Sequence, residues 1–183
     1  MGSRGRAVKL ADGRNALAED FRTRAELRRK GRFFEDFAIG QRFTHHWGRT
    51  LNAGDNSLFT TLTLNFNPLY FNAEYARAHG HPRELVCPML VLATVFGLSV
   101  EDLSESGGAF LGVEDLTFAN PVYPGDTLTA VSQVLDARPS SSRPDMGVVG
   151  WKTEGFNQKD ERVIAFVRSN LIVRRPSGES KNI

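Results

Sequence analysis

The sequence predicts an α+β fold in which a curved antiparallel sheet wraps around one apolar helix. The first observation is a 15-residue run, Val86–Val100, that is too apolar for a surface helix. The second is the series of four long β-type segments that follows it, separated by short turn sequences that suit antiparallel neighbours. One sheet covers only one side of such a helix, so we expect a second copy of the chain to cover the rest.

One strand and one helix are expected at the start of the body. Arg42–Thr50 alternates apolar and polar residues as a half-buried strand does. Leu58 and Leu62 then recur at helical spacing behind Asp55, a residue type that caps helix N-termini. These residues predict a helix over 55–64.

A proline ends this helix, and a second short helix is expected after it. Pro68 disfavours helix in the residue before it, so Leu69–Phe71 is expected to be short and extended. Asn72 is a favourable N-cap and Gly80 a favourable terminator for the short helix between them.

The apolar run predicts the central helix, and strands are expected after it. Pro88 suits the first turn, where its missing N–H costs nothing. Because the helix from Pro88 to Val100 is apolar nearly all round, we expect it to be buried on most of its faces. The expected strands are Ala109–Phe118, Asp126–Ala137, Gly147–Asn157 and Arg162–Arg174.

The charges are unevenly distributed along the chain. It has 183 residues, 40% hydrophobic and 24% charged, with a formal net charge of +2. Residues 1–32 hold ten basic and four acidic side chains, a net charge of +6, which leaves −4 for the rest. We expect a loosely attached basic arm over 1–31, one domain over 32–175 and a polar tail over 176–183. A total charge this small makes no case for nucleic acid as a partner.

Several classes of protein are excluded. The apolar run is shorter than the about 20 residues of a membrane span, and the N-terminus lacks the apolar core of a signal peptide. Cys87 is the only cysteine, which excludes an internal disulfide framework and fits a reducing, cytoplasmic compartment. His45 and His46 are adjacent in an expected strand and point to opposite faces, so no metal site is expected. No phosphate-binding glycine loop or nucleophile elbow is present.

Four segments of the body form a set: Gly48-Arg49-Thr50, Asp55, Asn67-Pro68-Leu69 and Pro121–Leu128. Together they resemble the MaoC-like dehydratase family, whose members are hot-dog-fold hydratases of acyl thioesters. The string P-V-Y-P-G-D-T-L is the most specific piece, and the start Phe33–Gly40 is similar too. The resemblance covers about Arg32 to Arg175, and the subgroup looks like the single-domain relatives of mesaconyl-CoA and itaconyl-CoA hydratases.

The resemblance implies reversible hydration or dehydration of a short or branched enoyl-CoA thioester, with dicarboxylic acyl groups included. In the family, a segment of the form D-x-N-P-x-H supplies an Asp and a His that activate water, and a backbone N–H near the start of the central helix polarises the thioester oxygen. The matching segment here is N-F-N-P-L-Y, so Asn65 and Tyr70 stand at those two positions. Asn does not titrate and Tyr has an ordinary pKa of about 10, so neither is a base near neutral pH.

Three interpretations of this altered pair stay open. In the first, Asn65 and Tyr70 are the catalytic residues of a hydratase and a third group is the base. The second is a hot-dog protein that binds an acyl thioester without hydrating it, with Tyr70 as a core aromatic. The third is a thioesterase, an activity that hot-dog folds also support. The ionisable candidates for the base are Asp55, Glu74, His79, His81 and Glu84.

Five further residues are expected to bind the substrate. Asn67 and Pro68 would hold the loop, and Cys87, Pro88 and Met89 would form the helix start that faces the thioester oxygen. The alternatives are a plain turn at Asn67-Pro68 and a small buried residue at Cys87. The expected partners are an acyl-CoA or acyl-carrier thioester and a second copy in a homodimer, without nucleic acid, membrane or metal. Hydration is redox-neutral, so no cofactor is expected beyond the CoA of the substrate.

Overall fold

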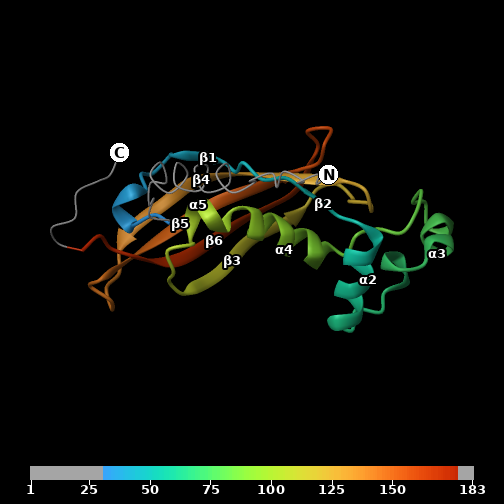
Figure 1. The fold of residues 1–183 in the computed structure, drawn as a ribbon, viewed down its shortest axis with the longest axis horizontal. Helices are drawn as coiled ribbons and strands as arrows, with labels where there is room; N and C mark the ends of the chain where they lie inside the picture. The colour runs from blue at the N-terminus through green and yellow to red at the C-terminus, as the bar shows by residue number, and fades with distance from the viewer. Residues whose placement is uncertain (1–30, 177–183) are drawn as a thin grey trace, which may run out of the picture.

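The computed structural model describes residues 31–176, whose fold is shown in Figure 1. The expected arm 1–31 and tail 176–183 lie outside the described residues, apart from Gly31 and Pro176. Among residues 31–176 no helix is long and apolar enough to cross a membrane. The elements are η1 (Phe34–Asp36), β1 (Arg42–Thr44), β2 (Arg49–Thr50), α2 (Ala53–Leu62), η2 (Pro68–Tyr70), α3 (Ala73–Ala78), α4 (Pro88–Leu98), α5 (Val100–Leu103), β3 (Phe110–Phe118), β4 (Thr127–Pro139), β5 (Met146–Phe156) and β6 (Arg162–Val173).

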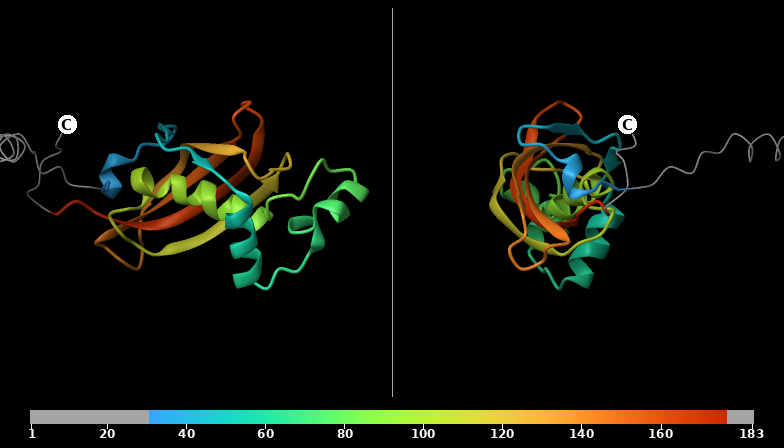
Figure 2. Two further views of the ribbon diagram at one scale, coloured as in Figure 1. Left: turned by 45° about the vertical axis from the view of Figure 1, so that its right-hand side comes forward. Right: turned by 90° about the vertical axis from the view of Figure 1, so that its left-hand side faces the viewer.

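The strands of residues 31–176 form one antiparallel sheet. Its order is β1-β4-β5-β6-β3, and β2 also pairs with β4. In the middle of the sheet, Trp151 on β5 is opposite Val134 on β4 and Arg168 on β6. The end-on view in Figure 2 shows the strands curving around α4. The predicted architecture, a curved sheet around one apolar helix, is therefore confirmed, and each predicted strand after the helix begins and ends within two residues of β3 to β6.

One stripe of α4 forms the main core. Val91 and Val95, one helical turn apart, are buried against the sheet. Gly155 on β5 allows this contact, because a Cβ there would lie 2.7 Å from the Val95 side chain. The prediction that α4 is buried on most of its faces is wrong for the single chain: Met89 is 44% exposed, and the other apolar residues of its outer faces are only partly covered.

A second core cluster lies under α5 at the far end of the sheet. Leu103 of α5 is fully buried there with Trp151, and Phe37, which follows η1, makes an edge-on ring contact with Trp151 at 5.2 Å between centroids. The predicted helix over 88–100 is divided at Ser99, where α4 ends and α5 begins.

Two predicted elements start differently. The strand predicted over Arg42–Thr50 is divided into β1 and β2, which both pair with β4, while residues 45–48 lie between them. The helix predicted over 55–64 begins at Ala53, because the N-cap is Asn52 and not Asp55. Asn52 Oδ1 accepts the Asp55 N–H at 2.9 Å, and the Asp55 carboxylate accepts the Asn52 N–H at 3.0 Å, a reciprocal capping box.

The segment after α2 is more helical than predicted. Leu69–Phe71 is not extended, because Pro68–Tyr70 forms the 3-10 turn η2. Asn72 caps α3 as predicted, accepting the Tyr75 N–H at 3.0 Å, and Gly80 follows with φ of +85°. Figure 1 shows α2, η2 and α3 together beyond the end of the sheet, beside the start of α4.

Candidate functional site

Three of the residues singled out from the sequence meet at the start of α4. Asn65 follows α2, Tyr70 ends η2, and Cys87 is the N-cap of α4. Asn65 Nδ2 donates to Cys87 Sγ at 3.3 Å. The pKa of the Tyr70 hydroxyl is raised by burial and, to a smaller degree, by Cys87. The altered segment and the helix start therefore form one site, although Asn65 and Cys87 are 22 residues apart in the chain.

The first turn of α4 presents one free backbone donor. Pro88 has no N–H, and the N–H groups of Leu90 and Val91 both donate to the Cys87 carbonyl, at 2.9 and 3.2 Å. The Cys87 N–H is also occupied, by Asn56 Oδ1 at 2.8 Å. Within residues 31–176 only the Met89 N–H of this turn has no acceptor. A helix N-terminus with a free N–H favours an oxygen that carries negative charge.

Asn56, which the sequence analysis did not single out, joins the parts of this site. It is 2% exposed on the inner face of α2. Its Nδ2 donates to the carbonyl oxygens of Tyr70 at 2.7 Å and Leu85 at 2.9 Å, while its Oδ1 accepts the Cys87 N–H. The only feature of the sequence that could have indicated this role is an amide side chain one turn before Thr60, on the same face of the helix.

The two residues at the dyad positions can exchange hydrogen bonds with water, but neither is a base. Burial raises the pKa of the Tyr70 hydroxyl above its usual 10, and Cys87 adds to the rise. Tyr70 is therefore protonated at neutral pH and acts as a donor. Asn65 Oδ1 has no donor among the described residues, so it can accept a hydrogen bond from a water molecule.

The ionisable groups considered as the base make their contacts elsewhere. None of them contacts Asn65 or Tyr70 among the interactions of residues 31–176. The three acids form ion pairs with arginines: Asp55 with Arg49 at 3.3 Å, Glu84 with Arg83 at 3.4 Å, and Glu74 with Arg77. The two histidines make hydrogen bonds. His79 Nδ1 donates to the Tyr75 carbonyl, and His81 Nδ1 lies 3.1 Å from the Tyr123 hydroxyl.

The other predicted residues divide between a local turn and two cavities. Asn67 is exposed, and its side chain caps η2 by accepting the Leu69 N–H at 3.1 Å, with Pro68 in the first turn. Asn65 and Met89 line a cavity of about 400 Å³. Pro88 lines another, of about 300 Å³, together with the end of β3.

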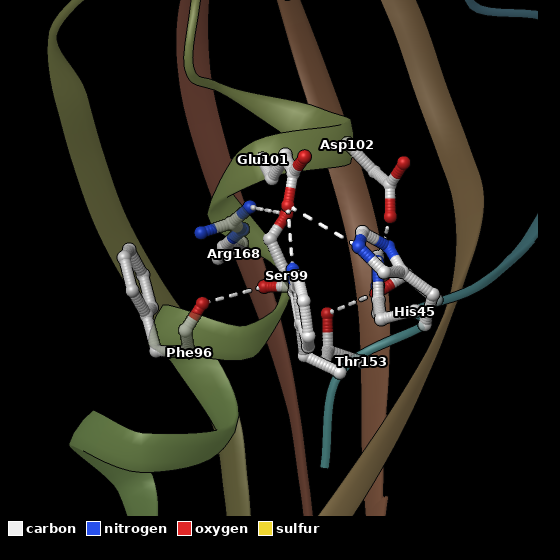
Figure 3. Close-up of polar contacts among 10 residues, drawn as sticks. His45, Phe96, Ser99, Glu101, Asp102, Thr153 and Arg168 are labelled. Atoms are coloured by element: carbon white, nitrogen blue, oxygen red, sulfur yellow. Dashed lines mark hydrogen bonds and ion pairs between the residues drawn. The ribbon is translucent and has the colours of Figure 1, made fainter. Parts of the chain in front are cut away.

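A second polar cluster lies at the far end of α4 (Figure 3). It contains His45, whose only role considered from the sequence was that of a metal ligand. His45 Nδ1 donates to Asp102 Oδ2 at 2.7 Å, and its Nε2 accepts from Ser132 Oγ at 2.9 Å. This is the order of a Ser-His-Asp triad. However, Ser132 is 3% exposed and is also bonded to Thr153 Oγ1 at 2.8 Å, so its oxygen is closed to a substrate. The cluster ties α5 to the sheet, and among residues 31–176 no three His, Cys, Asp or Glu side chains could hold a metal ion.

Comparison with solved structures defines the class of the fold. A MaoC domain protein dehydratase from Chloroflexus aurantiacus superposes with a TM-score of 0.77 at 35% identity, over 82% of this chain and 42% of its own. A Mycobacterium tuberculosis protein with a double hot-dog fold superposes with a TM-score of 0.75 at 26% identity, over 82% of this chain and 47% of its own. The chain folds as a MaoC-like hot-dog domain, as its sequence motifs predicted.

The sequence comparison narrows this class to one family. The sequence model of the mesaconyl-CoA hydratase family matches residues 14–181 of this chain. The mesaconyl-CoA hydratase of Haloarcula marismortui is 41% identical over 170 residues, which are 92% of this chain and 47% of that protein. The chain belongs to the mesaconyl-CoA hydratase family, and it spans about half the length of the curated relatives that it matches.

Proposed function

We propose that this chain takes part in the reversible hydration of a short or branched enoyl-CoA thioester, including acyl groups with a second carboxylate. The observation that carries the proposal is the free Met89 N–H at the start of α4, where Met89 and Asn65 line the same cavity. The relative from Haloarcula marismortui is named a mesaconyl-CoA hydratase, which supports an acyl group of this class.

The residues of the site fit the charge changes of this reaction. Water adds its oxygen to the β-carbon and a proton reaches the α-carbon, so negative charge develops on the thioester oxygen. The Met89 N–H and the positive end of α4 stabilise that charge. Asn65 Oδ1 orients the water, and the protonated Tyr70 hydroxyl donates a hydrogen bond to it. Hydration is redox-neutral, so the proposal needs no cofactor beyond the CoA of the substrate.

The general base is supplied in this proposal by a second copy of the chain. β3 is an edge strand with exposed Phe110, Leu111 and Phe118, which suits pairing with another sheet. The end of β3 and Pro88 line the same cavity, so a unit paired to β3 would stand beside the start of α4. Leu111→Arg is expected to dissociate this homodimer in sedimentation experiments. The control is Leu135→Arg. Leu135 is exposed on β4, away from the β3 edge, so this variant is expected to leave the homodimer intact.

A hydration assay tests the function. Crotonyl-, mesaconyl- and itaconyl-CoA are offered separately, and loss of the conjugated thioester is followed with mass spectrometry of the product. We expect hydrated product from wild type, and its loss in Asn65→Ala and Tyr70→Phe. The matched control is Tyr75→Phe, which removes the hydroxyl of an exposed tyrosine on α3 and should keep full activity.

One observation favours a second candidate, an acyl-thioester-binding protein without hydratase activity. None of the five ionisable candidates contacts Asn65 or Tyr70 within residues 31–176. Tight CoA binding by calorimetry, with no hydrated product from any of the three thioesters, would support this candidate against hydration. Release of free CoA thiol in the same reactions would support thioester hydrolysis instead.

A further inference from the structure

We propose that Asn56 is the positioning residue of this site: it fixes Tyr70 and the start of α4 relative to each other and leaves Met89 as the single free donor of the helix. The inference rests on the proposed function for its catalytic consequence, while its structural part stands on three hydrogen bonds. Asn56 does not face the substrate; it acts through the residues that do.

The side chain of Asn56 is used to its full donor capacity. An Asn amide has two N–H donors, and both are directed at carbonyl oxygens, those of Tyr70 and Leu85. Its oxygen accepts from the backbone N–H of Cys87. Because two partners only accept and one only donates, a single orientation of the amide satisfies all three. The residue is 2% exposed, so water does not replace these partners.

The three partners belong to two segments that are both remote from Asn56 in the sequence. Tyr70 lies 14 residues from Asn56, Leu85 lies 29 residues away, and Cys87 lies 31 residues away. The first segment carries Tyr70, and the second, which contains Leu85 and Cys87, leads into α4. A direct backbone bond, from Leu85 N–H to Leu69 O at 2.9 Å, joins the same two segments beside Asn56.

Asn56 also decides which backbone donor remains free. Without its Oδ1, the Cys87 N–H would be a second unpaired donor at the helix start, two residues before Met89. With it, the Cys87 N–H is occupied and the Cys87 carbonyl receives both Leu90 and Val91. The thioester oxygen then has one place to bind, which is what orientation of a reacting group requires.

Neither Asp nor Leu makes the same three bonds. Asp keeps the acceptor for Cys87 but places a carboxylate against two carbonyl oxygens, which raises its pKa. Leu has a similar volume and loses all three bonds. Thr60 offers a matched control, because it lies one turn later on the same helix and is equally buried, but its hydroxyl bonds only to carbonyls of α2 itself.

The experiment compares Asn56→Leu, Asn56→Asp and Thr60→Val with wild type in full-length protein. Backbone amide exchange of Cys87 is measured by NMR, with the amides of β5 as internal references. We expect exchange of the Cys87 N–H to rise at least about 10-fold in Asn56→Leu, and to stay near wild type in Thr60→Val and, because Oδ1 remains, in Asn56→Asp. Equal Cys87 exchange in wild type and Asn56→Leu would overturn the inference.

Kinetics give the second readout. With a thioester that wild type hydrates, kcat is expected to fall about 100-fold in Asn56→Leu while KM changes little, because misplacement of the reacting groups costs about that much. In Asn56→Asp, kcat should recover as the pH is lowered, since a protonated carboxyl regains one donor. A rise in KM alone, or the same kcat loss in Thr60→Val, would refute positioning. If wild type hydrates no thioester, the proposed function fails and the amide exchange alone decides for or against Asn56.

Discussion

Replacing Arg168 by Met is expected to stabilise the protein. Arg168 is fully buried on β6, and within residues 31–176 its Nε and Nη1 have no hydrogen-bond partner and no carboxylate lies within ion-pair distance. Its polar contact is a long one, from Nη2 to the Ser99 carbonyl at 3.4 Å. The guanidinium instead lies over the Phe96 ring, 4.3 Å from the centroid, and 5.4 Å from that of Trp151.

The expected magnitude follows from the cost of burying the charge. Burial lowers the pKa of Arg168 from its usual value to about 10, which corresponds to about 3 kcal/mol against the charged form in the fold. The substitution would lose about 2 kcal/mol of cation–π attraction and about 1 kcal/mol for the hydrogen bond. A Met sulfur between the same two rings returns about 1 kcal/mol. The net gain is about 1 kcal/mol, or a rise in Tm of about 2–4 °C for a domain of this size.

Urea unfolding of wild type and Arg168→Met measures this difference, with Arg162→Met as the control. Arg162 lies at the exposed end of the same strand and pairs with Glu154 at 3.0 Å, so its loss should change stability by less than about 0.5 kcal/mol. Above pH 10 the unfolded chain holds the Arg168 proton more firmly than the folded one, so wild type should gain stability relative to the variant as pH rises. A loss of 2 kcal/mol or more in Arg168→Met would refute the reasoning, because the two nitrogens must then have a partner in solution.

Two further predictions concern stability. Gly155→Ala should lower the free energy of unfolding in urea by about 1–3 kcal/mol, because the new Cβ would lie 2.7 Å from the Val95 side chain. The control Gly112→Ala, where a Cβ would meet nothing within 4 Å, should lower it clearly less. Equal losses in the two variants would mean that α4 is not held close to β5. Burial lowers the pKa of His45 below 6.5 against the opposing pull of Asp102, so below pH 6.5 the unfolded chain takes up a proton that the folded chain refuses. Wild type should therefore lose up to about 1.4 kcal/mol per pH unit relative to His45→Gln as pH falls from 6.5, and parallel curves for the two proteins would contradict this.

The fold was largely predictable because its signals are local. Four long alternating segments separated by turns define β3 to β6, and the turn before β4 forms as expected, with the Asp126 N–H on the Tyr123 carbonyl at 3.0 Å and Gly125 at φ of +104°. The division of the first strand was not predictable, because residues 45–48 alternate like the strand on either side. The His45 side chain points inward because it forms hydrogen bonds with Asp102 and Ser132, and both of these residues are remote from it in the sequence.

The site was predictable only where side chains carry the signal. The resemblance to MaoC-like dehydratases indicated Asn65, Tyr70 and Cys87, and the structure places Asn65 and Cys87 in contact, with Tyr70 near enough to Cys87 for the two to interact electrostatically. Asn56 was missed because its three partners are backbone groups, which every residue possesses, at separations of 14 to 31 residues. A pattern of residue types cannot report a bond to a carbonyl that far along the chain.

The two ends of α4 meet opposite electrostatic needs with one helix. At its start the free Met89 N–H and the positive end of the helix dipole face the place where negative charge would develop. At its end the Ser99 carbonyl accepts from Arg168, so the negative end of the dipole faces a buried cation that has no carboxylate partner among the described residues. The helix has 11 residues and is about 16 Å long, since each residue adds 1.5 Å. Arg168 is therefore too far from Met89 to reach the second carboxylate of a short acyl group bound there, and a residue that recognises such a carboxylate has to lie nearer to the start of α4.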